Sequence, residues 1–516
     1  QTQQIYSCQT SRDYFPVIRL FFFSTRSQIW QVYELMLQAT SAVAAILAVL
    51  VAWTATQHDT APTLRSVHRV DCSTHTAGCQ LERLAAPALL VFPNDAQRRL
   101  AIALAWSDLR MRRAIGSEIL SWSTKRCAAG DARCRARPSL FLNVNAELAR
   151  QADLNIRLHA RSSQTFEQFW TEAATSRGEG VWRYAAIELD RSLPSDADLA
   201  AAIDTAAPPN ASLTFRGSTT PEWAERSMLW LSTAGVEAQL HYDELHNVFV
   251  QLRGHKEMLL LPPNASAHVR LFPRQHPFQR QARVTAPRVG GRLTRVACNG
   301  AGAEAEAGAG VSISVGDAEK GCGAAALVSS GEYGGWETEG RRVVLAPGDT
   351  LYLPPFWYHA VLSLDASASV SFVGDAAETA TTLASRELRH CTDAGWALEK
   401  KALALRLLLI ALLGRPRLVE LYAQRYYLRG AEDAPTPAPR WARACAAYAA
   451  GDLDAPPLLS AAERARGRNI ARARRALFDT ISDRDVREQI EMNEAELMLS
   501  QELGYSRVAT WLRVCV

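Results

Sequence analysis

The sequence lacks a strong excess of charge of either sign, since 57 lysines and arginines stand against 53 aspartates and glutamates. This balance gives no strong field to attract nucleic acid or an anionic membrane. No tandem repeat is visible, and no pair of cysteines has the CxxC spacing of a structural zinc site. Apolar residues make up 48% of the 516 residues and charged residues 21%. This composition is typical of a globular protein of roughly two to four domains.

Only one run of apolar residues is long, which excludes a polytopic transporter. Residues 35–57 carry no formal charge, and a helix needs about 20 apolar residues to cross a bilayer. The run predicts a single-pass membrane anchor at 35–56 within an N-terminal segment, 1–57. Three arginines precede it, which favours a cytosolic N-terminus and a lumenal remainder. A cleaved signal or organelle-targeting segment and a buried helix of a soluble protein are the alternatives.

The ten cysteines fit an oxidising compartment. Three local pairs could close as disulfides: Cys72 with Cys79, Cys127 with Cys134, and Cys298 with Cys322. Glycosylation sequons at Asn210 and Asn264 favour the same compartment. Together these features predict a membrane-anchored protein whose folded part lies in the lumen of the secretory pathway.

The hydrophobic pattern changes along the chain. Residues 58–80 are polar and predict a stalk. Over 81–378, helical patterns give way to short runs rich in Leu, Val, Phe and Tyr with turns between them, which predict strands. A Gly/Ala-rich stretch at 298–335 interrupts these runs and predicts a surface insert. Helical periodicity returns over 379–516.

Two segments of the helical region could suggest other functions. The basic run at 463–475, ERARGRNIARARR, has the periodicity of the solvated face of an amphipathic helix, so it gives no strong nucleic-acid signal. The apolar run at 406–414 is too short to span a bilayer and predicts a core helix or a dimer helix.

The most informative segment begins with a His-x-Asp motif. Residues two apart on a strand point to one face, so His241 and Asp243 converge while Tyr242 points away. An imidazole and a carboxylate suit Fe(II), and His359, in an apolar and aromatic strand, offers a third ligand. Three protein ligands on one face of an octahedral iron leave three coordination positions open. Two of these suit 2-oxoglutarate and the third suits O2.

The acid co-substrate needs a cation for its distal carboxylate. Lys256 lies thirteen residues beyond Asp243, after a turn at Arg253-Gly254 that predicts a hairpin and brings it beside the ligand strand. Each residue alone is a weak signal, because His-x-Asp motifs occur by chance and a lone His359 is more often a core histidine. Their order, and the Pro347–Asp349 turn before the second strand, favour a metal site.

These segments resemble the JmjC or cupin-like Fe(II)/2-oxoglutarate oxygenases, most of all the asparaginyl hydroxylases that inhibit hypoxia-inducible factor. The similarity is clearest over 228–286 and 341–373. It implies a mainly β protein with helical flanks, built on a double-stranded β-helix or jelly-roll cupin core with an α-helical C-terminal tail. The implied iron ligands are His241, Asp243 and His359, and the implied 2-oxoglutarate residues are Lys256, Tyr184, Asn247 and Ser371.

Two positions depart from the family pattern. Ala238 stands where relatives have a threonine, and Ser371 stands where they often have asparagine. Both departures affect residues expected to contact 2-oxoglutarate, and neither removes a metal ligand.

The resemblance implies hydroxylation of a protein side chain, with succinate and CO2 as co-products. A JmjC lysine demethylase, a tRNA-modifying hydroxylase and a catalytically inactive cupin binding module remain alternatives. A protein substrate is the expected partner, and the C-terminal helices, which form a dimer interface in relatives, suggest a homodimer.

Overall fold

The structure is a computed structural model, in which contacts divide the chain into Gln1–Ala61 and Pro62–Val516. Every element described below belongs to the second unit. The described residues are 65–72, 79–81, 84–117, 119–128, 139–141, 144–151, 155–157, 160–175, 180–188, 206, 213–214, 227–282, 284–285, 294–295, 312–314, 340–388, 391–426, 439–449 and 458–516.

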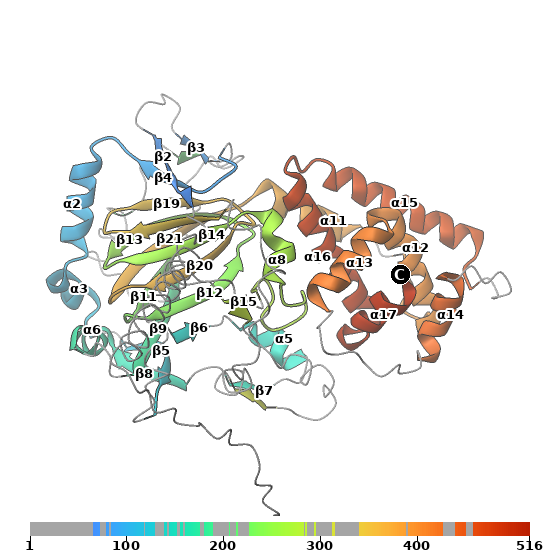
Figure 1. The fold of residues 1–516 in the computed structure, drawn as a ribbon, viewed down its shortest axis with the longest axis horizontal. Coiled ribbons are helices and arrows are strands. Elements are labelled where there is room, and N and C mark those ends of the chain that lie inside the picture. Colours follow the sequence, from blue (N-terminus) through green and yellow to red (C-terminus); the bar gives the residue numbers. More distant parts are fainter. Residues whose placement is uncertain are drawn as a thin grey trace, which may run out of the picture. The chain divides into compact units, whose positions relative to one another are not determined.

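A nine-stranded sheet forms one wall of the β domain (Figure 1). Its strands, in spatial order, are β2 (His68–Asp71), β4 (Ala88–Val91), β19 (Thr350–Leu353), β13 (His246–Arg253), β21 (Ser367–Gly374), β11 (Met228–Ser232), β9 (Val181–Glu188), β5 (Ile119–Arg126) and β8 (Ala160–Thr165). Three helices pack against this sheet through a shared apolar cluster: α2 (Asp95–Ala105), α3 (Asp108–Ile115) and α6 (Phe166–Thr175).

A six-stranded sheet forms the other wall. Its strands, in spatial order, are β1 (Arg65–Ser66), β18 (Arg341–Leu345), β14 (Lys256–Leu261), β20 (Tyr358–Ser363), β12 (Val236–Tyr242) and β6 (Ser139–Phe141). Consecutive strands alternate between the two sheets, from β11 to β14 and again from β18 to β21. This alternation is the winding of a double-stranded β-helix, so the predicted jelly-roll cupin core is confirmed.

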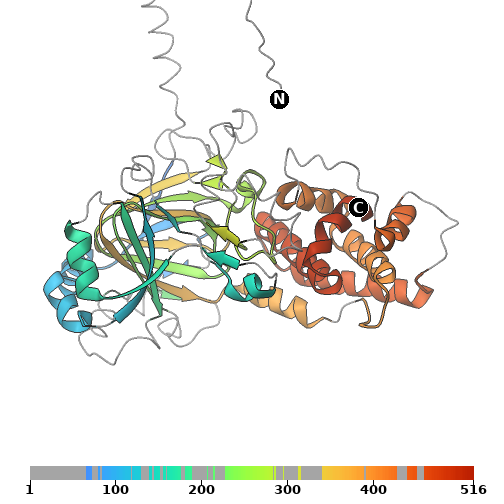
Figure 2. The ribbon, with the colours of Figure 1, turned by 90° about the horizontal axis from the view of Figure 1, so that it is seen from below.

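The C-terminal residues form a group of helices beside the β domain (Figures 1 and 2). They are α11 (Ala377–Glu387), α12 (Leu398–Leu413), α13 (Arg415–Arg425), α14 (Arg440–Ala449), α15 (Ala461–Phe478), α16 (Arg484–Leu503) and α17 (Val508–Cys515). The predicted helical tail is therefore confirmed, and the basic run 463–475 lies on α15.

Smaller elements complete the described part of the chain. They are the paired strands β3 (Cys79–Gln80) with β10 (Leu213–Thr214), β7 (Asn155–Arg157) with β17 (Ser312–Ser314), and β15 (Val284–Thr285) with β16 (Thr294–Arg295), and the helices α5 (Ala146–Gln151), η4 (Pro263–Ala265), α8 (Ser266–Val269) and η6 (Tyr505–Arg507).

Alternation along the strands of the six-stranded sheet separates two environments. On β12 and β20, Leu240, Tyr358 and Ala360 belong to one apolar cluster with the C-terminal helices. The residues between them, including His241 and His359, point to the opposite face, toward the interior of the barrel. On β12 and β20, His241 and His359 therefore face the interior, while Leu240, Tyr358 and Ala360 face the helices.

The predicted hairpin after the His-x-Asp motif is not formed. Strands β13 and β14 follow each other in the chain but lie in different sheets. The turn at Gly254, whose φ is +64°, leads the chain from one sheet to the other. Lys256 reaches the interior because β14 pairs with β20, where its Cα partner is Ser363. It therefore lies beside the strand of His359 and not beside β12.

The prediction of a membrane-anchored protein with a lumenal domain needs correction. In the described parts of the chain, none of the helices combines the length and the apolar character needed to cross a bilayer. The segment 35–56, on which the prediction rested, lies outside the described residues. The finding contradicts the predicted localisation, which is not retained.

The structure describes only some residues of the predicted stalk and of the predicted insert. Within the predicted stalk 58–80, residues 65–71 include β1 and β2, which pair with strands of the two sheets, and Val67 between them is buried. Nearly all of the predicted insert 298–335 lies outside the described residues.

Four of the described cysteines bear on the predicted disulfides. Cys72 and Cys127, one member of each of two predicted pairs, are disulfide-bonded. A bridge between Cys445 on α14 and Cys515 on α17 was not predicted, because 70 residues separate the two cysteines.

The turn at Gly254 makes a prediction about stability. An alanine there would have to keep a left-handed backbone, which costs about 1–2 kcal/mol, and its Cβ would collide with the Ala366 carbonyl and the Asp365 side chain. We expect Gly254→Ala to lower the free energy of unfolding, measured in urea, by at least about 2 kcal/mol. Gly395→Ala, where an added Cβ meets nothing within 4 Å, is the matched control and should be close to neutral. Equal effects of the two substitutions would contradict this account.

Candidate metal centre

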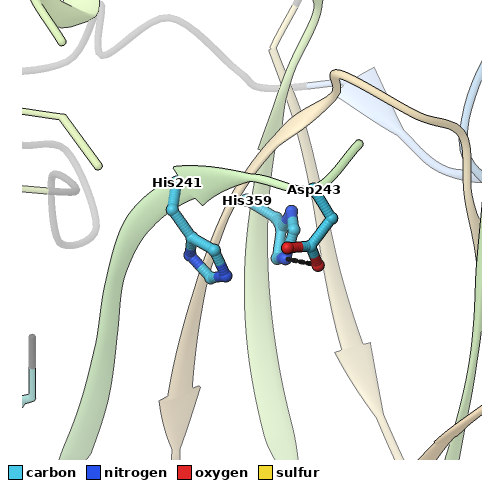
Figure 3. Close-up of side chains that lie close together, drawn as sticks. All are labelled: His241, Asp243 and His359. Carbon is cyan, nitrogen blue, oxygen red and sulfur yellow. Dashed lines mark ion pairs between the residues drawn. The ribbon is translucent and has the colours of Figure 1, made fainter. Parts of the chain in front are cut away.

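Two histidines and one aspartate meet inside the barrel (Figure 3). His241 and His359 are direct Cα partners on β12 and β20, and their ring centroids lie 4.2 Å apart. Asp243 follows β12, and its Oδ2 lies 3.7 Å from His359 Nε2. One potential ligand atom from each residue lies within 4.8 Å of the other two. The three residues that the sequence singled out are therefore brought together.

A β-bulge sets the direction of His241. Between Ala238 and His241 the pairing of β12 with β20 shifts by one residue, because Ala238 faces Val361 while His241 faces His359. The extra residue lets Ala238 and His241, three apart, point to the same face of the sheet. Without it, strand alternation would turn His241 away from His359.

Backbone carbonyls fix the orientation of both imidazoles. His241 Nδ1 lies 2.6 Å from the Gln239 carbonyl oxygen, and His359 Nδ1 lies 3.1 Å from that of Trp357. Because a carbonyl only accepts, each Nδ1 carries the proton. In the neutral ring, Nε2 then keeps a lone pair directed into the site, which is the arrangement of a metal-binding histidine.

The local electrostatics favour a neutral imidazole beside an ionised carboxylate. Burial, assisted by the charge of His359, lowers the pKa of His241 to about 4. Burial alone would raise the pKa of Asp243, but the charges of His241, His359 and Arg280 and a hydrogen bond from Asn247 lower it overall. His241 and Asp243 thus favour the protonation states in which they bind a divalent cation.

Asn247, on β13, borders the cluster. Its side chain is buried and hydrogen-bonds the Asp243 carboxylate. Its Oδ1 is also buried, and no group in the described residues donates a hydrogen bond to it. A buried polar atom without a partner is costly, which indicates that a bound group or water satisfies it.

Lys256 carries a buried amine in the same interior. Only 2% of the residue is exposed, and its Nζ donates to Ser369 Oγ at 2.6 Å. No ion pair joins Lys256 to a carboxylate of the described residues. Burial lowers the pKa of Lys256 to about 7. A buried amine of this kind is suited to receive an acid from outside the chain.

Serine hydroxyls surround this lysine. Ser232 Oγ lies 2.7 Å from Ser363 Oγ and 2.9 Å from Ser367 Oγ, and Ser369 holds the amine. Ala238 supplies no hydroxyl to this interior. Ser369 was not identified from the sequence, although the alternation Ser367-Ala-Ser369-Val-Ser371 places three hydroxyls on one face of β21 and could have indicated it.

Tyr184 and Ser371 are linked through Trp230. The Tyr184 ring stacks on Trp230 with centroids 6.0 Å apart, and Trp230 Nε1 donates to Ser371 Oγ at 2.9 Å. Burial and then the charge of Asp243 raise the pKa of Tyr184, so its phenol remains protonated. Trp230 is also the Cα partner of Ser369. Both predicted co-substrate residues therefore lie in the serine-lined interior beside Lys256.

Arg280 is a further residue that the sequence did not single out. Its guanidinium lies 3.5 Å from Asp243 Oδ1, and its side chain is 34% exposed. Its φ of +65° is unusual for a non-glycine residue. The next residue, Gln281, forms a β-bridge to His241, so Arg280 is held at the solvent side of the cluster. Only its place in the segment 271–284, resembling a family loop, could have indicated it.

The residues that form this cluster lie in a part of the chain that matches a known family. Residues 119–373 match the model of the cupin-like domain family. A stretch of 144 residues is 28% identical to Jumonji C domain-containing protein 5 of Drosophila melanogaster. That stretch covers 28% of this chain and 26% of the fly protein, so the chain matches about a quarter of that relative's length. The chain therefore contains a cupin-like domain, and the three clustered side chains lie at or near the strands of its core.

Proposed function

We propose that this protein is an Fe(II)- and 2-oxoglutarate-dependent dioxygenase that hydroxylates a protein side chain. The observation that carries the proposal is the His241, Asp243 and His359 cluster in a cupin-like barrel that also buries an amine with no carboxylate partner among the described residues. A metal-binding cluster alone fits several kinds of cupin. The additional buried amine favours an acidic co-substrate.

The donor set fits Fe(II). Two imidazoles and one carboxylate on one side of a cation form the facial arrangement that non-haem iron oxygenases use. His241 and His359 would each present Nε2, and Asp243 would present a carboxylate oxygen. The hydrogen bond from Asn247 would keep that carboxylate in place, in the way that outer residues usually orient metal ligands.

The co-substrate would occupy the serine-lined interior. Lys256, held by Ser369, would pair with the distal carboxylate of 2-oxoglutarate, and Tyr184 would donate a hydrogen bond to it. Ser371, whose oxygen accepts from Trp230, would keep its own proton for donation. In this arrangement Ser369 compensates for the hydroxyl that Ala238 lacks.

The chemistry divides between the metal and the chain. Bound iron would supply the activation of O2, with one oxygen atom entering succinate as CO2 leaves 2-oxoglutarate and the other forming a hydroxyl group on a substrate carbon. The residues would position 2-oxoglutarate and exclude water, with the protonated Tyr184 and the charged form of Lys256 donating to the co-substrate. Arg280, at the solvent side, would contact the substrate or the Asp243 carboxylate.

A protein substrate is supported by the resemblance of segments 228–286 and 341–373 to asparaginyl hydroxylases. The apolar C-terminal helices support a homodimer, since several of their side chains, such as Val419, are exposed. Both assignments are part of the proposal.

Turnover of 2-oxoglutarate tests the proposed function. We expect succinate to form in the presence of Fe(II), O2 and 2-oxoglutarate, and His241→Ala to abolish it because one of three ligands is lost. His255→Ala, which changes a half-exposed histidine paired with Asp365, is the control and should turn over normally. Succinate would be measured by mass spectrometry. A wild-type protein that forms no succinate and binds neither metal nor 2-oxoglutarate would refute the proposal and favour an inactive binding module.

The buried lysine predicts a pH dependence of co-substrate binding. Lys256 loses its charge above about pH 7 in the free protein, and a bound carboxylate would raise that pKa. Binding then takes up a proton, so the affinity for 2-oxoglutarate should be constant below pH 7. It should fall by up to about tenfold per unit above that pH.

Calorimetric titration of the protein with Mn(II) at saturation would measure this slope without turnover. Lys256→Arg is the matched variant, because a guanidinium stays charged throughout the range, and its slope should be flat. Lys256→Ala should weaken binding at pH 6.5 at least about 30-fold, since losing one partner of a buried charge pair costs about 2 kcal/mol or more. Equal slopes for the wild type and Lys256→Arg would contradict the assignment.

A further inference from the structure

Helix α16 packs polar residues where an apolar face would be expected. Gln489, Asn493, Glu496 and Ser500 are all buried and are spaced by four, three and four residues. This spacing places them in one stripe along the helix. Two of the four, Asn493 and Glu496, hydrogen-bond residues of the β domain.

The first contact reaches the metal-binding strand directly. Asn493 Nδ2 donates to the Tyr242 hydroxyl at 3.0 Å. Tyr242 lies between His241 and Asp243 in the chain and points to the other face of the sheet. Its ring is held by Phe356, stacked at 5.6 Å, and by Tyr358 in an edge contact at 5.6 Å. Moving Tyr242 would therefore move the backbone that carries both ligands.

The second contact reaches the residue after Asp243. The Glu496 carboxylate accepts from the backbone N–H of Arg274 at 2.7 Å. The Arg274 guanidinium in turn binds Glu244 through both nitrogens, at 2.7 and 3.4 Å. Thr379 Oγ1 also donates to the Glu244 carbonyl oxygen at 2.6 Å. Both neighbours of Asp243 are thus held from outside the barrel.

One buried guanidinium joins the two contacts. Arg425, on α13, pairs with Glu496 and donates to Asn493 Oδ1 at 2.7 Å. The amide of Asn493 is therefore oriented, with its oxygen toward Arg425 and its nitrogen toward Tyr242. Glu496 also accepts from the Tyr426 hydroxyl.

Such a network contributes little net stability, because burying its charged groups costs free energy of desolvation. Removing two charges from water offsets most of their attraction, and apolar residues of similar size often stabilise a protein as well or better. A satisfied polar network does fix one relative position of the groups it joins. Here the groups that it joins are α16 and the backbone on each side of Asp243.

We propose that α16 is a positioning element of the metal centre, acting through Asn493 on Tyr242 and through Glu496 and Arg274 on Glu244. The inference rests on the proposed function, because it assigns these residues a role toward the bound metal. The helical region then sets the geometry of the cluster and does more than cover an apolar sheet.

The test compares metal affinity with stability. Asn493→Ala and Tyr242→Phe each remove the contact, and Tyr242→Phe does so by deleting one oxygen. We expect each to weaken Mn(II) binding about tenfold, the lower end of the effects seen for residues behind metal ligands. Together they should weaken it no more than either alone, because both break the same hydrogen bond. Titration of free Mn(II) by electron paramagnetic resonance gives the affinity, and urea unfolding without metal gives the stability.

Ser385→Ala is the matched control. It breaks another buried hydrogen bond of the helical region, from Arg474 to Ser385 Oγ at 3.0 Å, without touching the metal-binding strand. It should lower stability and leave the Mn(II) affinity unchanged. If Asn493→Ala fails to fold, Tyr242→Phe decides the outcome.

The outcomes separate this inference from the proposed function. If the wild type binds Mn(II) and His241→Ala does not, but Asn493→Ala and Tyr242→Phe bind as tightly as the wild type, the positioning role is refuted and the metal site stands. An equal loss of affinity in Ser385→Ala also refutes it, because the effect would then follow stability alone. A wild type that binds no metal refutes both.

Discussion

The pairing of β12 with β20 is the constraint on which the candidate site depends. It sets His241 opposite His359 and, through one extra residue in β12, turns both imidazoles inward. Asp243 joins them because the chain leaves the strand directly afterwards, with its carbonyl oxygen accepting from the Phe356 N–H at 2.7 Å. The cluster is therefore a property of strand register, and every other residue of the site acts around a geometry that the backbone already defines.

The second constraint is the balance of buried charge. The barrel interior holds one carboxylate near two imidazoles and, on the neighbouring strand, an amine supported by hydroxyl groups. Among the described residues, the amine donates to Ser369 but pairs with no carboxylate, and Asn247 Oδ1 has no hydrogen-bond partner. An interior of this kind is unfavourable when it contains only protein atoms. Under the proposed function, a cation and a dicarboxylic acid would complete this interior and offset that cost.

Much of this could be read from the sequence, and the parts that could not have definite physical causes. The two-residue spacing of His241 and Asp243 was informative because the strand alternates. The hairpin around Gly254 was predicted wrongly, because a turn signal does not reveal whether the two strands pair or enter different sheets. Ser369 and Arg280 were missed since their roles depend on which strands and loops lie side by side, and no local pattern records that.

The membrane anchor was predicted from one uncharged apolar run and the arginines that precede it, and the described helices do not support it. The polar stripe of α16 was equally invisible, because Gln489, Asn493 and Glu496 lie in a charged segment that is typical of a solvated helix. Only the packing of α16 against Tyr242 shows that this stripe is buried. Sequence patterns therefore identified the residues of the barrel interior better than those that support it from behind.

The bulge in β12 has a consequence for how related chains can be compared. Positions before the bulge, such as Ala238, and positions after it, such as His241, face the same interior although an odd number of residues separates them. In a homologue that lost the extra residue, the position equivalent to Gln239, and not that of Ala238, would face the interior. Alignments of distant cupins that allow no gap at this point will pair an inward side chain with an outward one. Such an alignment would record an inward-facing residue as missing when it has only moved to the next position in the chain.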